Sequence, residues 1–77
     1  MKTVKVEWCE NFIKATFRKY RCKGIYTELF WTLAEESGLW ERGTYGSPMS
    51  KALGNITIVE AITDDEGNYL YSVFKLA

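Results

Sequence analysis

Apolar and polar residues alternate at the start of the chain. In the sequence TVKVEW, Val4, Val6 and Trp8 alternate with Lys5 and Glu7. A period of two residues is typical of a strand with one buried face, and valine favours strands. We therefore predict a short N-terminal strand.

The following segment, NFIKATFRKYRCKG, fits two patterns. As a helix it begins at Asn11 and carries Ile13, Phe17 and Tyr20 on one face. As a strand its apolar and charged residues alternate, and it pairs with the N-terminal strand as a hairpin. The spacing favours the helix, but the sequence leaves both structures open for residues 12–21.

Two further helices are predicted in the middle of the chain. The segment YTELFWTLAEESG has a helical stripe that ends before Gly38, a residue that suits the left-handed stop of a helix. In SPMSKALG, Ser47 is an N-cap, Pro48 occupies the first helical position, and Gly54 is the expected end. The stripe of the longer helix consists of Tyr26, Leu29, Phe30, Leu33 and Ala34.

The C-terminal part predicts a β-hairpin. Two strand-like runs, ITIVEAI and YLYSVFKL, flank a turn that contains Asp65, Gly67 and Asn68. The predicted fold is therefore a small single α+β domain over residues 1–77, with an N-terminal strand, three helices of which the third is short, and a C-terminal hairpin. If residues 12–21 are extended, the alternative is a ββααββ order with an antiparallel sheet.

Charge is distributed unevenly although the chain is formally neutral. Residues 1–24 contain seven Lys or Arg and two Glu, a net charge of +5. Residues 25–77 contain three Lys or Arg and eight Asp or Glu, a net charge of −5. This asymmetry indicates either a dipolar surface or ion pairing between the two halves.

The residue types exclude much enzyme chemistry. The chain has no histidine, the commonest general base and metal ligand, and its two cysteines, Cys9 and Cys22, do not have the spacing of a zinc site. No phosphate-cradling glycine loop is present. We therefore expect a protein that binds rather than catalyses, without cofactor or metal, and we expect at least one cysteine to be a small core residue.

The sequence pattern also bears on the cellular location of the protein. The sequence MKTVKVEWCE has no apolar signal region, and no apolar run approaches the roughly 20 residues that span a bilayer. We expect a cytoplasmic protein with no membrane partner.

The order of predicted elements, with TLAEESGL and SPMSKAL at its centre, resembles the winged helix-turn-helix domains over residues 10–76. Ala34 and Gly38 match the small residue of the second helix and the glycine that opens the turn. The resemblance implies that SPMSKAL is the third helix, which lies in the major groove of DNA, and that the hairpin is the wing.

The resemblance also implies which residues approach nucleic acid. Ser47, Ser50 and Lys51 of the third helix would face DNA, and Arg42 and Tyr45 would lie on the approach to it. This sequence differs from the family pattern in its longer turn, residues 38–47, and in the acidic tip of its hairpin.

A basic segment offers a second candidate contact with nucleic acid. Five cations in KATFRKYRCK interleave with Phe17 and Tyr20, and this combination suits phosphate contact with base stacking. The cations are also compatible with the solvated side of a helix. They are Lys14, Arg18, Lys19, Arg21 and Lys23.

The alternative function is a protein-binding regulator or inhibitor, of the kind that phages and other mobile elements encode. Trp40, Arg42 and Tyr45 lie in a predicted loop and belong to residue types that are enriched at binding hot spots. Three adjacent carboxylates at the hairpin tip would be repelled by phosphate, and in this alternative they or the aromatic loop would meet the target protein. They are Asp64, Asp65 and Glu66. The sequence fixes neither the partner nor the oligomeric state.

Overall fold

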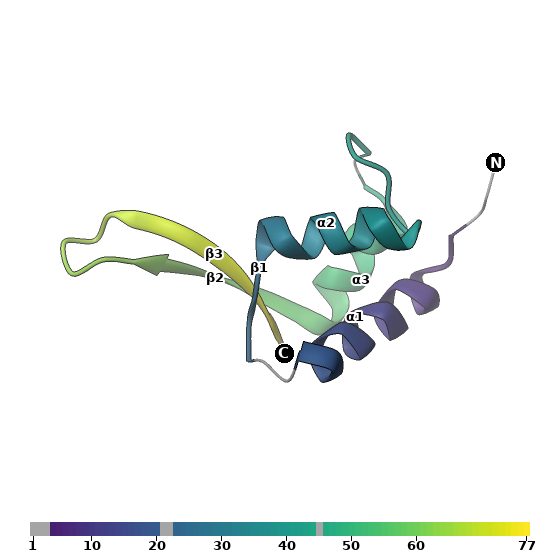
Figure 1. Cartoon of the computed structure of the whole chain (residues 1–77), viewed down its shortest axis with the longest axis horizontal. Coiled ribbons are helices and arrows are strands. Elements are labelled where there is room, and N and C mark those ends of the chain that lie inside the picture. The colour runs from purple at the N-terminus through teal and green to yellow at the C-terminus, as the bar shows by residue number, and fades with distance from the viewer. Residues whose placement is uncertain (1–3, 21–22, 45) are drawn as a thin grey trace.

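The computed structural model describes residues 4–20, 23–44 and 46–77 (Figure 1). Three strands form one antiparallel sheet in the order β1-β3-β2. The predicted α+β class, with three helices and a C-terminal hairpin, is confirmed. The elements are α1 (Val6–Tyr20), β1 (Ile25–Tyr26), α2 (Thr27–Ser37), α3 (Pro48–Ile56), β2 (Thr57–Thr63) and β3 (Tyr69–Leu76).

The predicted N-terminal strand is wrong, because Val6 already belongs to α1. The carbonyl of Lys5 accepts hydrogen bonds from the backbone N–H of Trp8 at 3.1 Å and of Cys9 at 3.3 Å, so the first helical turn starts there. The alternation over residues 4–8 is too short to separate a strand from a helix. The longer spacing from Cys9 to Ile13, both fully buried, has the helical period.

The described part of the segment that remained open, residues 12–20, is helical throughout. The ββααββ alternative is therefore wrong, and the remaining residue of that segment, Arg21, lies outside the described residues. Ile13 and Phe17 are buried as the helical stripe predicts, but Tyr20 is about half exposed near the end of the helix. The strand that precedes α2 is β1, which pairs with β3 by only two residues.

Phe30 of α2 lies at the centre of the core. Its ring packs 5.3 Å from that of Phe74 on β3 and 5.9 Å from that of Phe12 on α1, measured between centroids. Such tilted and edge-on pairs are favoured by the ring quadrupoles. The buried cluster that surrounds Phe30 draws on all three helices and the sheet, and contains Cys9, Ile13, Phe17, Ile25, Ala34, Met49, Ala52, Leu53 and Phe74.

Cys9 is a packing residue, as predicted for one of the two cysteines. Its side chain is fully buried, and burial, followed by the charge of Glu10, raises the pKa of its thiol. A buried thiol that resists ionisation is a poor nucleophile. Cys22 lies outside the described residues.

The stripe of α2 is narrower than the sequence predicts. Phe30 and Ala34 are buried, whereas Leu29 and Tyr26 are about half exposed. The ring of Tyr26 instead packs edge-on against Tyr71, with 5.0 Å between centroids. Tyr26 and its neighbour Ile25 point to opposite faces of the sheet because they belong to a strand.

Local signals correctly locate the ends of most other elements. Gly38 follows α2 in the left-handed conformation, with φ of 80°. Ser47 caps α3 by accepting a hydrogen bond from the backbone N–H of Ser50 at 3.2 Å, and Pro48 is the first residue of that helix. The predicted end at Gly54 is wrong, because α3 continues to Ile56 and leads directly into β2.

The hairpin of β2 and β3 extends away from the three helices (Figure 1). This gives the molecule principal dimensions of 47 × 26 × 21 Å. The helices cover only the part of the sheet near β1, where Ile25 and Phe74 are buried. The distal half of the hairpin is exposed on both faces.

Candidate nucleic-acid interface

The outer face of α3 is a polar surface next to the core. Met49, Ala52 and Leu53 point inward and anchor the helix against α1 and the sheet. Because an α-helix has 3.6 residues per turn, the two pairs of residues that follow Met49 and Leu53 lie on the opposite, exposed side of the helix. We call this exposed set the α3 face, and it consists of Ser50, Lys51, Gly54 and Asn55.

Gly54 is the unusual member of the α3 face. Glycine inside a helix costs roughly 0.5–1 kcal/mol relative to alanine. A Cβ atom added at Gly54 would meet no atom of the described protein within 4 Å, so packing within the chain does not require glycine here. Its φ is not positive, unlike that of Gly38. Without a side chain at Gly54, the backbone of α3 is accessible to a close approach by another molecule.

A groove joins the α3 face to the basic part of α1. Lys14 and Arg18, one helical turn apart on α1, line it together with Asn55 of α3. The groove has a volume of about 640 Å³, and its other lining residues are Phe17, Ile56, Leu76 and Ala77. Two of the five predicted cations therefore lie beside the predicted third helix.

One carboxylate lies at the edge of this surface. The Oε2 atom of Glu10 accepts a hydrogen bond from Nδ2 of Asn55 at 3.4 Å, which links α1 to α3. Glu10 partly offsets the positive charge of Lys14 and Arg18. This hydrogen bond uses the side-chain N–H of Asn55, so the side-chain oxygen Oδ1 can accept a hydrogen bond from a ligand.

Lys19 and Lys23 are not among the residues that line the groove. Lys19 follows Arg18 directly and is rotated from it by about 100° around α1, and its ammonium lies 5.5 Å from the ring centroid of Tyr20. Lys23 is exposed in the bend that precedes β1. Arg21 lies outside the described residues. Of the four described cations of the basic segment, two, Lys14 and Arg18, line the groove.

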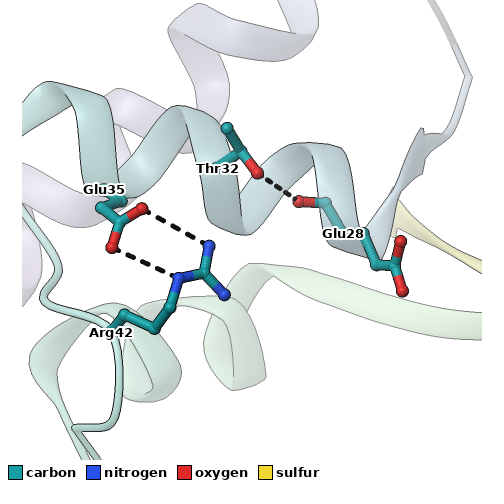
Figure 2. Close-up of polar contacts among 4 residues, drawn as sticks. All are labelled: Glu28, Thr32, Glu35 and Arg42. Carbon is teal, nitrogen blue, oxygen red and sulfur yellow. Dashed lines mark hydrogen bonds and ion pairs between the residues drawn. The ribbon is translucent and has the colours of Figure 1, made fainter.

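Two residues of the aromatic loop that was predicted to bind a protein, Trp40 and Arg42, make contacts within the molecule. Trp40 packs against Trp31 of α2 with 4.6 Å between ring centroids and an angle of 45° between the ring planes. The guanidinium of Arg42 lies 5.5 Å from the centroid of the Trp40 ring. Figure 2 shows Arg42 also paired with Glu35, with distances of 3.3 Å from Nε and 3.4 Å from Nη2 to the two carboxylate oxygens. Tyr45 lies outside the described residues.

The hairpin tip uses one of its three carboxylates for its own structure. Asp64 Oδ1 accepts hydrogen bonds from the backbone N–H groups of Asn68 at 2.8 Å and Glu66 at 2.9 Å. These bonds close the turn. Asp65 and Glu66 are exposed and leave the tip strongly negative.

Sequence reasoning did not place Asn55 and Gly54 on the α3 face because it ended the third helix at Gly54. Extending the helical period from Ser50 and Lys51 by one turn would have placed both residues on the same face. The partner of Asn55 lies 45 positions away in the sequence, so no local signal could have indicated that contact.

Comparisons with protein-family models, with curated proteins and with solved structures found no match to this chain. Within residues 4–20, 23–44 and 46–77, no helix combines the length and the apolar character needed to cross a bilayer.

Proposed function

We propose that this chain is a winged helix-turn-helix-like domain that binds duplex DNA in the cytoplasm, by contact rather than by catalysis. The observation that carries the proposal is the α3 face, which is exposed and contains a glycine that the fold does not require. The element order α1-β1-α2-α3-β2-β3 supports it, because the same order places a reading helix before a hairpin wing in that family.

The α3 face carries side chains that suit base edges in the major groove. Lysine donates to O6 and N7 of guanine, asparagine pairs with N6 and N7 of adenine, and serine accepts or donates to several bases. In this proposal Lys51 and Asn55 contact bases, Ser50 contacts a base or a phosphate, and Gly54 allows the helix backbone to approach the groove closely.

Phosphate contacts come from α1 rather than from the wing tip. Lys14 and Arg18 line the protein groove beside Asn55. From there they can reach the DNA phosphates that flank the major groove in which α3 would lie. The three carboxylates at residues 64–66 would be repelled by phosphate. We therefore propose that DNA lies across α1 and α3 and that the hairpin tip stays away from it.

The salt dependence of DNA binding tests this assignment quantitatively. The two proposed phosphate contacts, Lys14 and Arg18, predict a slope of about −1.8 for log K against log salt concentration, since each phosphate contact contributes about −0.9. Neutralising Lys14 or Arg18 to glutamine should reduce the slope by about 0.9. Fluorescence anisotropy of a labelled duplex across a salt series measures it.

Two variants serve as controls in the same assay. Lys19→Gln removes the same charge from another side of α1 and should leave the slope unchanged, whereas Glu10→Gln removes the carboxylate beside the groove and should tighten binding. The proposal is wrong if the protein does not bind duplex DNA at low salt. It is also wrong if Lys19→Gln and Arg18→Gln change the slope equally.

A further inference from the structure

The outer edge of β2 has no partner in the described protein. In the sheet order β1-β3-β2, β2 pairs only with β3, and its opposite edge faces outward. Thr57–Thr63 is a strand of seven residues with a regular register from Thr57 to Ile62. An edge of this length presents a row of unpaired N–H and C=O groups to another strand.

This edge lacks the features that usually prevent pairing between sheets. Its sequence, TIVEAIT, contains no proline and no lysine, and the register irregularity lies at its far end, between Ile62 and Thr63. The only charge is Glu60, which forms an ion pair with Lys75 of β3. Natural sheets commonly protect an exposed edge with lysine, proline or a bulge in the middle of the strand.

The sheet also exposes much apolar surface. Of the ten large hydrophobic residues that are exposed in the described part of the chain, seven belong to its three strands. The chain exposes 5642 Å². A compact monomer of this mass should expose about 4800 Å². The excess of several hundred Å² reflects the hairpin that extends away from the helices, and two of the seven exposed residues, Ile58 and Val59, lie on β2 itself.

We propose that two copies of this chain pair through β2, antiparallel and two-fold symmetric, to form one continuous six-stranded sheet. Among two-fold registers, only the one centred on Glu60 pairs all seven residues of the strand. On one face of the sheet, Ile58 of each copy lies opposite Ile62 of the other copy. On the other face, Val59 of each copy lies opposite Ala61 of the other. Apolar cross-strand pairs of this kind stabilise a sheet.

The charges of β2 and β3 fit this register. The two copies of Glu60 lie opposite each other at the two-fold axis, where like charges alone would repel. Each is paired with Lys75 of its own chain, so the centre of the interface contains two cations and two anions. The ion pair therefore makes the edge neutral and competent for pairing with itself.

Sedimentation equilibrium over the micromolar range tests the proposal, with the protein alone and no DNA present. The unmodified chain should behave as a dimer that dissociates on dilution. Ala61→Lys places a charge in the middle of the edge and should give a monomer, whereas Ala15→Lys, the same change at an exposed position of α1, should leave the dimer intact. A monomeric parent at all concentrations, or equal masses for the two variants, would overturn the proposal.

The Glu60–Lys75 pair provides a second test that loss of fold cannot imitate. Both Glu60→Gln and Lys75→Gln break the same ion pair and should affect the folded monomer alike. In the dimer, Glu60→Gln removes a like-charge contact and should lower the dissociation constant, whereas Lys75→Gln leaves two facing carboxylates and should raise it, each by up to about fivefold. Changes of the same sign in both variants would contradict the register.

These measurements are independent of the proposed DNA binding. A dimer that does not bind DNA would leave the strand-pairing inference standing and remove the proposed function. A monomer that binds DNA with the predicted salt slope would do the opposite.

Discussion

Asp64 illustrates how one side chain at the hairpin tip stabilises the local fold. Its carboxylate accepts hydrogen bonds from the backbone and side-chain N–H groups of Asn68 and from the backbone of Glu66. These contacts, with the Asn68 backbone first, lower the pKa of Asp64 below its usual value of 3.8. A carboxylate that is used in this way is less available for a protein partner than the sequence predicted.

The depressed pKa of Asp64 predicts how the turn responds to acid. Its stabilising effect is present above the unfolded pKa and is lost as the pH falls through the lower folded pKa. Asn68→Ala removes the side-chain hydrogen bond and should move the Asp64 pKa upward toward 3.8. Carboxyl-carbon NMR titration of both proteins measures this shift. An unchanged Asp64 titration in the variant would show that the Asn68 amide contributes nothing.

Residues whose role depends on near neighbours were predictable from the sequence. Ser47 and Gly38 act through backbone groups within three residues, as the predicted helix cap and helix stop. The expectation that Ser47 faces DNA is wrong, because its side chain is buried as the cap of α3. The surroundings of Arg42 were not predictable, because Glu35 and Trp40 compete for it with solvent and with any external partner. Exposed ion pairs of this kind contribute only about 0–1 kcal/mol, so the pairing alone leaves no strong sequence signal.

At the scale of elements, α1 shows where periodicity is informative and where it fails. Over its full length the buried positions Cys9, Ile13, Thr16 and Phe17 follow the helical period. Over residues 4–8 alone, alternation and helical spacing coincide, so the predicted strand had no independent support. The two-residue strand β1 was missed because it is shorter than any periodic signal can reveal.

The α3 helix supports a prediction that separates stability from binding. Gly54→Ala should raise the free energy of unfolding by roughly 0.5–1 kcal/mol, because helical glycine is costly and the new methyl group meets open space. The same variant should bind duplex DNA more weakly, since the methyl group holds the helix backbone away from the groove. Urea denaturation and anisotropy measure the two effects.

Gly38→Ala is the matched control for that variant. Gly38 has a positive φ of 80°, so alanine there should lower the free energy of unfolding by roughly 1–2 kcal/mol. It should leave the DNA affinity of the folded protein unchanged, because Gly38 lies outside the α3 face. If Gly54→Ala destabilises the protein, or stabilises it without weakening binding, the assignment of Gly54 to the contact surface is wrong.

At the scale of the whole molecule, the uneven charge predicted from the sequence persists in three dimensions. Both ion pairs in the described part of the chain, Arg42 with Glu35 and Lys75 with Glu60, join residues of the acidic second half. The cations of α1 are therefore not consumed by pairing between the halves in that part of the chain. Composition predicted the imbalance, but only the structure shows that Lys14 and Arg18 lie beside α3.

The overall arrangement also explains why fold and site differ in predictability. The order of the helices and the hairpin follows from local patterns, so most of the fold was predictable. The candidate site is formed where α1 and α3 meet, at residues 45 positions apart such as Glu10 and Asn55. Contacts of that separation are set by packing around Phe30 and are not encoded in any short segment.

The most direct test of the central claim is an NMR titration of isotopically labelled protein with duplex DNA, in which the chemical shifts of the backbone amides are monitored. The proposed function predicts that the largest shifts occur along α3, at Ser50, Lys51 and Gly54, and on α1 around Lys14 and Arg18. Shifts confined to the distal hairpin, or no shifts at low salt, would contradict it.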